Sequence, residues 1–275
     1  MDIFNSVLNS LFNILFIPFK NVNPVWGMLG VSFLTGIIML FIFKVTSDQA
    51  GIRKAKNHVK AHFLAIRLYR DDISLMLDTM KNIFLSNFYY MKKSLKPMMF
   101  LILPVALILI HLGTRYEHRP LKVGESTILS LRLEKNTTLA QLNSIKLELP
   151  ESLSCDAPPV RIEQLNEINW RIKAEKPGNY ELAFSLEGKT IKKRLQVVDE
   201  LVAVTSRVAR GSFTTTLMNP AEPSLPGSVP VAFITVDYPK RDFKLLGFNL
   251  HWLVAFFVLS LVFGFSFKGV LGVEL

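Results

Sequence analysis

The chain has 275 residues, of which 50% are hydrophobic, and carries a formal net charge of +10. Its apolar residues gather in a few dense runs, which indicates membrane spans and not an evenly distributed soluble core. The single cysteine, Cys155, excludes an intramolecular disulfide and a cysteine-based zinc site. The positive charge is compatible with nucleic-acid binding. However, much of it lies beside hydrophobic runs, which favours anionic lipid as the partner.

Residues 3–19 are expected to form an amphipathic helix. Apolar residues recur at helical spacing, Asn and Ser occupy the opposite side, and Pro18 stops the helix. Because the segment is too short to span a membrane, it is expected to lie in the interface plane; an ordinary packing helix is the alternative. The chain opens with Asp2 and lacks a small-residue cleavage site, so this segment is not expected to be a signal peptide.

Residues 25–43 form the first long uncharged run, with 19 residues, and predict a membrane-spanning helix. Trp26 suits the outer interface and Lys44 the cytosolic one, so the N-terminus is expected outside. A small, mildly polar patch lies in the middle of this run: Ser32, Thr35 and Gly36. Such residues favour close helix packing, and a polar surface that faces a client is the alternative interpretation.

Residues 46–96 are expected to form a cytosolic helical hairpin. Asp48 would cap the first helix, and a second helix would run from Ile73 into Leu95. Both carry apolar residues at helical spacing, so facing apolar stripes should pack as an antiparallel pair. Residues 51–97 hold ten basic and three acidic residues, which gives a net charge of +7. This charge favours contact with an anionic leaflet; equally, it could serve only to fix the orientation of the spans in the membrane. The basic residues assigned to this contact are Arg53, Lys54, Lys56, Lys60, Arg67, Arg70, Lys92, Lys93 and Lys96.

Residues 97–114 predict a second span of 18 uncharged residues, interrupted by Pro97 and Pro104. His111 lies near its outer end. A polar residue inside a span is a functional candidate, although a position one turn from Arg115 can also reach interfacial water.

Residues 116–244 are expected to form an exported domain. Short alternating runs separated by turn signals over residues 116–200 predict a small all-β sandwich of immunoglobulin-like type, and residues 201–244 are expected to pack beside the sandwich or the membrane surface. Trp170 is expected to be its core aromatic residue, and residues 219–230 a proline-rich loop. The predicted strands are Ser126–Leu133, Ile145–Leu149, Val160–Gln164, Ile168–Lys173, Tyr180–Leu186, Ile191–Val198 and Val231–Tyr238.

Residues 245–275 are expected to form a third span, Leu245 to Phe267, followed by a cytosolic tail. His251 and Trp252 mark the outer end of this span and Lys268 its inner end. The sequence therefore predicts an α-helical membrane protein with three spans, an inserted β-sandwich, an outside N-terminus and a cytoplasmic C-terminus.

No common catalytic motif is present in the sequence, so no catalytic residue, cofactor or enzymatic activity is expected. His58 and His62 have the spacing of a metal pair on a helix, but no acidic or thiol residue nearby completes a site, and no metal is expected. The aromatic-and-basic platform that nucleic-acid binding needs is missing too.

Two short motifs carry a resemblance to a known family. Ser47-Asp48-Gln49 follows the first span, and Lys96-Pro97-Met98-Met99-Phe100 with Pro104 opens the second. Together with the order of helix, span, basic hairpin and span, they resemble the YidC/Oxa membrane-insertase superfamily, in particular its reduced three-span members from archaea and the endoplasmic reticulum. The likeness covers about residues 3–114 and, by order only, 245–268.

The resemblance implies a membrane insertase or membrane chaperone of an inner membrane of bacterial type. A mildly polar groove would receive nascent or client membrane proteins in a locally thinned bilayer, and the basic hairpin would contact clients or the ribosome first. The groove residues would be Ser32, Thr35, Gly36, Met98, Met99 and His111. The alternative is a non-catalytic scaffold, in which the same membrane part anchors a β-sandwich that binds an envelope protein.

Overall fold

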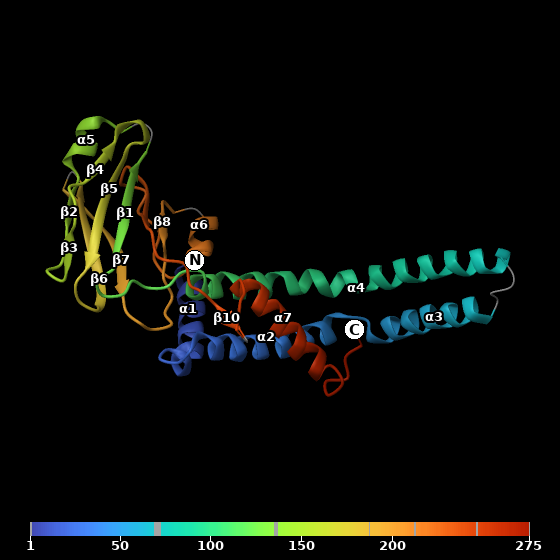
Figure 1. Ribbon diagram of the computed structural model, residues 1–275. Helices are drawn as coiled ribbons and strands as arrows, with labels where there is room; N and C mark the ends of the chain where they lie inside the picture. Colours follow the sequence, from blue (N-terminus) through green and yellow to red (C-terminus); the bar gives the residue numbers. More distant parts are fainter. Residues whose placement is uncertain are drawn as a thin grey trace. The chain divides into compact units, whose positions relative to one another are not determined.

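The computed structural model describes residues 2–68, 73–134, 137–186, 188–211, 213–245 and 247–274 (Figure 1). The chain divides into two compact units. Unit 1 comprises Met1–Gly27 and Leu109–Trp252, and unit 2 comprises Met28–Ile108 and Leu253–Leu275.

The strands of unit 1 form two antiparallel sheets and a small hairpin (Figure 1). The larger sheet has the order β3-β5-β1-β9-β8, with β4 also paired to β5, and the smaller has the order β2-β6-β7. The strands of the sheets are β1 (Ser126–Leu133), β2 (Lys146–Glu148), β3 (Leu153–Cys155), β4 (Val160–Ile162), β5 (Glu167–Ala174), β6 (Gly178–Leu186), β7 (Lys189–Val197), β8 (Arg207–Ala209) and β9 (Val231–Val236).

Both sheets contribute to one hydrophobic core. β1 and β7 bury every second residue, as expected of strands with one face turned inward. Trp170 of β5 is 5% exposed, and its ring centroid lies 5.6 Å from that of Phe184 on β6. The prediction that Trp170 is a core aromatic residue is confirmed.

The alternation of apolar and polar residues in the sequence predicted most of these strands. Each predicted strand has a counterpart, and β1 has the predicted bounds. The short strands β3 and β8 were not predicted, because three residues carry too little alternation to stand out. The short helices that were also not predicted are α5 (Leu139–Ser144), η2 (Glu163–Leu165) and α6 (Phe213–Met218).

The N-terminal helix α1 (Asp2–Phe16) belongs to unit 1 and ends in a 3-10 turn, η1 (Ile17–Phe19), that contains Pro18. Phe12 and Phe16 are buried, whereas Val7, Leu11 and Ile14 are exposed. A helix at residues 3–19 is therefore confirmed, but only part of its apolar surface packs inside unit 1.

Unit 2 is helical. Its helices are α2 (Pro24–Thr46, of which the first turn lies in unit 1), α3 (Gln49–Leu68), α4 (Ile73–Tyr116, up to Ile108) and α7 (Trp252–Phe267). Within the described residues, α2 and the Pro97–Tyr116 part of α4 are long and apolar enough to cross a membrane, with mean hydropathies of 2.2 and 2.1.

Helix α4 corrects the predicted break at the start of the second span. It runs unbroken through Pro97 and Pro104. Each proline removes one N–H donor from the helix ladder, but the Met, Leu and Ile residues around them keep the helical backbone on both sides. The hairpin helix and the second apolar run are one element.

The start of the predicted third span is also corrected. Leu245 lies in β10 (Lys244–Leu245), which pairs with β11 (Phe248–Asn249) in a hairpin. Gly247 has φ +87, a left-handed conformation that glycine adopts without strain and that a helix excludes. Helix α7 therefore begins only at Trp252 and has 16 residues.

Candidate functional site

The small polar patch of α2 is buried in unit 2. A Cβ atom added to Gly36 would lie 2.9 Å from the carbonyl oxygen of Ser260 and 3.1 Å from the backbone nitrogen of Gly264, both on α7. Gly36 thus allows two helix backbones to approach closely. Ser32 and Thr35, which are close to Gly36 in the sequence, are also buried. The hydroxyls of Ser32 and Ser260 have no hydrogen-bond partner among the described residues. Client contact by this patch stays a prediction.

The other predicted groove residues have different surroundings. Met98 and Met99 are exposed on α4. His111 belongs to unit 1, where its buried ring stacks on Phe12 with a centroid distance of 4.3 Å and an interplanar angle of 9°. Met98 and Met99 are therefore surface residues of unit 2, whereas His111 is a packed residue of unit 1.

Ser47-Asp48-Gln49 builds the joint between α2 and α3. The Asp48 carboxylate accepts a hydrogen bond of 2.9 Å from the Gly51 backbone N–H, as an N-cap does. The Gln49 side-chain oxygen accepts a hydrogen bond of 2.7 Å from the backbone N–H of Glu274. This motif therefore sets the start of α3 and holds the C-terminal segment against it.

The basic hairpin residues are partly engaged and partly free in solvent. Arg53 and Lys56 lie 3.3 Å and 3.5 Å from the carboxylate of Glu274, and Lys54, Lys60 and Lys92 are exposed. Arg70 and the side chains of Arg67, Lys93 and Lys96 lie outside the described residues. Contact of these residues with lipid or ribosome stays a prediction.

An exposed apolar row lies along α4. It consists of Met80, Phe84, Phe88, Met91, Leu95 and Met98, each at least 45% exposed, and is called the Met/Phe stripe below. At 3.6 residues per turn these positions fall within a sector of about 80° on one side of the helix. The prediction that the apolar stripe of this helix packs against α3 is wrong for these residues. The spacing was right, but the side chains are exposed, with Phe84 at 77%.

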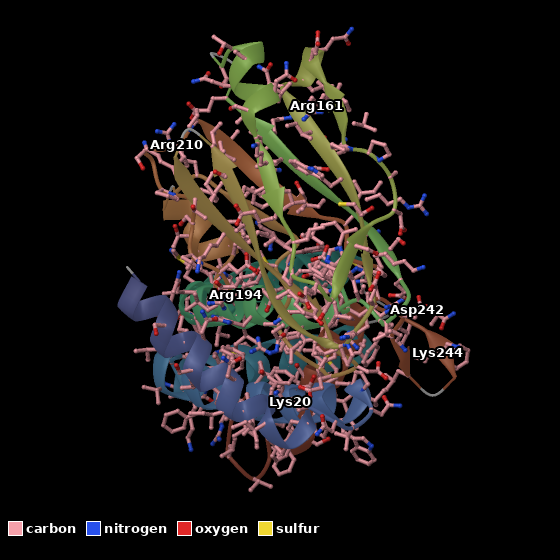
Figure 2. All side chains as sticks on the ribbon, turned by 90° about the vertical axis from the view of Figure 1, so that its left-hand side faces the viewer. Lys20, Arg161, Arg194, Arg210, Asp242 and Lys244 are labelled. Atoms are coloured by element: carbon pink, nitrogen blue, oxygen red, sulfur yellow. The ribbon has the colours of Figure 1, made fainter. Side chains whose placement is uncertain are left out.

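Unit 1 contains a large polar cavity of about 960 Å³. One wall is the Asn- and Ser-bearing side of α1, and further walls come from β7 and from the segments around residues 200–205 and 220–223. Asn5 donates to the carbonyl oxygen of Thr216 at 2.9 Å, and Asn9 donates to that of Pro220. These bonds hold the polar side of α1 at the cavity. Lys20 and Arg194, both labelled in Figure 2, also line it.

Arg115 lines the same cavity and is 2% exposed. Its guanidinium donates to Asn13 Oδ1 at 2.6 Å and to the His111 carbonyl oxygen at 3.1 Å, and lies 4.9 Å from the centroid of the Phe16 ring. In the sequence, Arg115 is only the charged residue that ends an apolar run. Its role in unit 1 depends on Asn13, which is 102 positions away in the sequence, so no local pattern could reveal it.

A buried ion pair lies next to this cavity. Lys193 Nζ is 2.8 Å from Glu222 and also donates to the carbonyl oxygens of Thr205 at 2.7 Å and Arg194 at 3.2 Å. The three ammonium donors are thus all used. Burial lowers the pKa of Lys193 and raises the pKa of Glu222, and the attraction between the two charges opposes both shifts.

Neither unit offers a metal centre in its described part, since no group of three or more His, Cys, Asp or Glu residues there could hold an ion. Comparisons with protein families, curated proteins and solved structures give no match to this chain.

Proposed function

We propose that the protein is a YidC/Oxa-like membrane insertase or membrane chaperone. In this proposal α2, the Pro97–Tyr116 part of α4 and α7 cross the membrane, with the N-terminus outside and the C-terminus in the cytosol. At 16 residues α7 is about 24 Å long, shorter than a hydrocarbon core of about 30 Å, which favours a locally thinned bilayer around it.

The Met/Phe stripe is the observation that carries the proposal. Its first and last members, Met80 and Met98, are 18 residues apart, or about 27 Å along the helix, close to the length of one transmembrane segment. Methionine side chains are flexible and polarizable, so a methionine-rich surface adapts to apolar partners of varied sequence. The stripe therefore suits a client segment that is apolar but not fixed in sequence.

The charges of the hairpin support the same role. Lys81 and Lys92 are exposed on the helix that carries the stripe, and Arg53, Lys54 and Lys60 on α3. On the cytosolic side these cations would face an anionic leaflet, where each contributes about 1 kcal/mol to membrane association. The stripe would then be held near the bilayer that a client has to enter.

The two sheets of unit 1 would form an extracytoplasmic sandwich of immunoglobulin-like type. This assignment rests on two antiparallel sheets around one core. The exposed apolar side chains of α1 would lie in the outer membrane–water interface.

Site-specific photocrosslinking tests the proposal. A photoreactive residue at Phe88 should crosslink to newly made single-span proteins in membranes that synthesise them. The same probe at Asn82, exposed about 120° around α4 from Phe88 and outside the Met/Phe stripe, is the control and should give little product. Equal crosslinking from both positions, or none from Phe88, would overturn the proposal.

A scaffold that binds an envelope protein is the second candidate, favoured by the cavity of unit 1. Phe88→Asp separates the two. It should abolish client insertion if the stripe receives clients, and should leave function intact if unit 1 alone does the binding.

A further inference from the structure

We propose that the cavity of unit 1 binds a phosphate group, with Arg115 as its principal ligand, and that the natural source of this group is the headgroup of an anionic phospholipid. The site lies within unit 1 and does not depend on the Met/Phe stripe or on insertase activity.

Arg115 is a buried cation whose acceptors are all neutral. They are Asn13 Oδ1, the His111 carbonyl oxygen and, at 3.4 Å, Thr114 Oγ1. No carboxylate lies within ion-pair distance of it in the described chain. A buried charge without a counter-ion is unfavourable, so its presence at a cavity wall points to an anion that is supplied from outside.

The donors of Arg115 match a phosphate group. Nη1 is used by His111 and Thr114, and Nη2 has one acceptor, Asn13. The Nε–H and the second Nη2–H have no acceptor among the described residues. Free N–H donors of a guanidinium form strong charge-assisted hydrogen bonds with phosphate oxygens.

The rest of the cavity wall leaves its positive charge uncompensated. Two carboxylates line it, and each is already paired: Glu200 with Lys20 at 3.0 Å and Glu222 with Lys193 at 2.8 Å. Arg194 also lines the cavity, and no carboxylate lies within ion-pair distance of it in the described chain. The hydroxyl of Thr205, a residue that is 5% exposed, has no partner either and can donate.

An apolar surface begins where the polar cavity ends. Ser6 and Ser10 line both the cavity and a shallow hollow on α1 formed with Val7, Leu11 and Ile14. These three apolar side chains are exposed. A phosphate in the cavity would therefore leave the remainder of its molecule next to an apolar helix surface, which suits acyl chains and gives no advantage to a free phosphate ion.

Binding by the full-length protein, purified in detergent and stripped of lipid, tests the inference. The probes are phosphatidylglycerol, diacylglycerol (which has the chains but no phosphate) and inorganic phosphate, with native mass spectrometry as the readout. Phosphatidylglycerol should bind at least tenfold more tightly than either of the others.

Three arginine variants locate the site. Arg115→Gln should lower phosphatidylglycerol affinity at least tenfold and Arg194→Gln severalfold. Arg161→Gln, on β4 and away from the cavity lining, is the matched control and should leave affinity unchanged (Figure 2). Arg194 is exposed, so its variant keeps the test decisive if Arg115→Gln fails to fold.

Two results would overturn the inference. One is unchanged phosphatidylglycerol affinity in a folded Arg115→Gln protein or, if that variant does not fold, in Arg194→Gln. The other is diacylglycerol or inorganic phosphate binding as tightly as phosphatidylglycerol, which would remove the phospholipid as the ligand.

Discussion

The two sheets of unit 1 share a core that buries large apolar side chains, whereas the helices of unit 2 leave many of theirs exposed. In unit 1, Trp170 and Phe184 are buried, and the buried cation Lys193 has three acceptors. In unit 2, Phe84, Met99 and Leu103 are mostly exposed. Water is a suitable solvent for the first arrangement and a poor one for the second. Unit 1 therefore contains its own core, whereas the exposed surface of unit 2 suits an apolar environment or partner.

The largest expected effect comes from a substitution in the hydrophobic core of unit 1. Trp170→Ala should reduce the free energy of unfolding of unit 1 by about 3–5 kcal/mol, because the cavity it leaves cannot close fully. Urea unfolding followed by limited proteolysis of the full chain measures this loss. Arg171→Ala, on the outward side of β5, is the control and should change little. A loss below 1 kcal/mol for Trp170→Ala would contradict a core centred on this residue.

The next effect concerns the buried ion pair. Lys193→Met keeps the volume but leaves Glu222 buried without its partner, which should cost about 3 kcal/mol at neutral pH. Because burial raises the pKa of Glu222 in the folded state, the loss should be greatest above that pKa and should shrink as the pH falls and the carboxyl is protonated.

The double variant Lys193→Met with Glu222→Leu is the control for this prediction. It removes both charges and should recover most of the stability, as measured by urea unfolding at pH 7. A double variant no more stable than Lys193→Met alone would show that the damage comes from packing and not from the unpaired carboxylate.

Much of unit 1 could be predicted from the sequence because alternation over six to nine residues identifies a strand and its inward face. The Met/Phe stripe shows the limit of this approach. The period of α4 locates an apolar row, but no local pattern tells whether α3, lipid or a partner covers it. The Arg115–Asn13 contact joins residues 102 positions apart, so only the folded chain brings the elements of the cavity together.

The close approach of α2 and α7 in unit 2 depends on Gly36. Gly36→Ala should destabilise the α2–α7 crossing by about 1–3 kcal/mol, because the added methyl group meets backbone atoms that cannot move aside easily. Gly264→Ala is the matched control: its Cβ would meet nothing within 4 Å, so this variant should stabilise α7 by about 0.5–1 kcal/mol. Thermal unfolding in detergent measures both. Equal effects of the two variants would contradict a close crossing at Gly36.

The smallest expected effect concerns a partly exposed ion pair of unit 1, Arg119 with Glu125. Arg119 donates two hydrogen bonds of 2.8 Å to the carboxylate of Glu125, which lowers the pKa of Glu125 below its ordinary value of 4.5. The stability from this pair is therefore complete above about pH 4.5 and is lost as the pH falls through the lowered pKa of the folded state. Both side chains are partly exposed, so Glu125→Gln should cost at most about 1 kcal/mol at pH 7. Urea unfolding from pH 7 to pH 3 should show the difference between the two proteins vanish at the acid end. A difference that stays constant over this range would mean that the pair contributes through packing alone, and the contrast between the units would then rest on their cores.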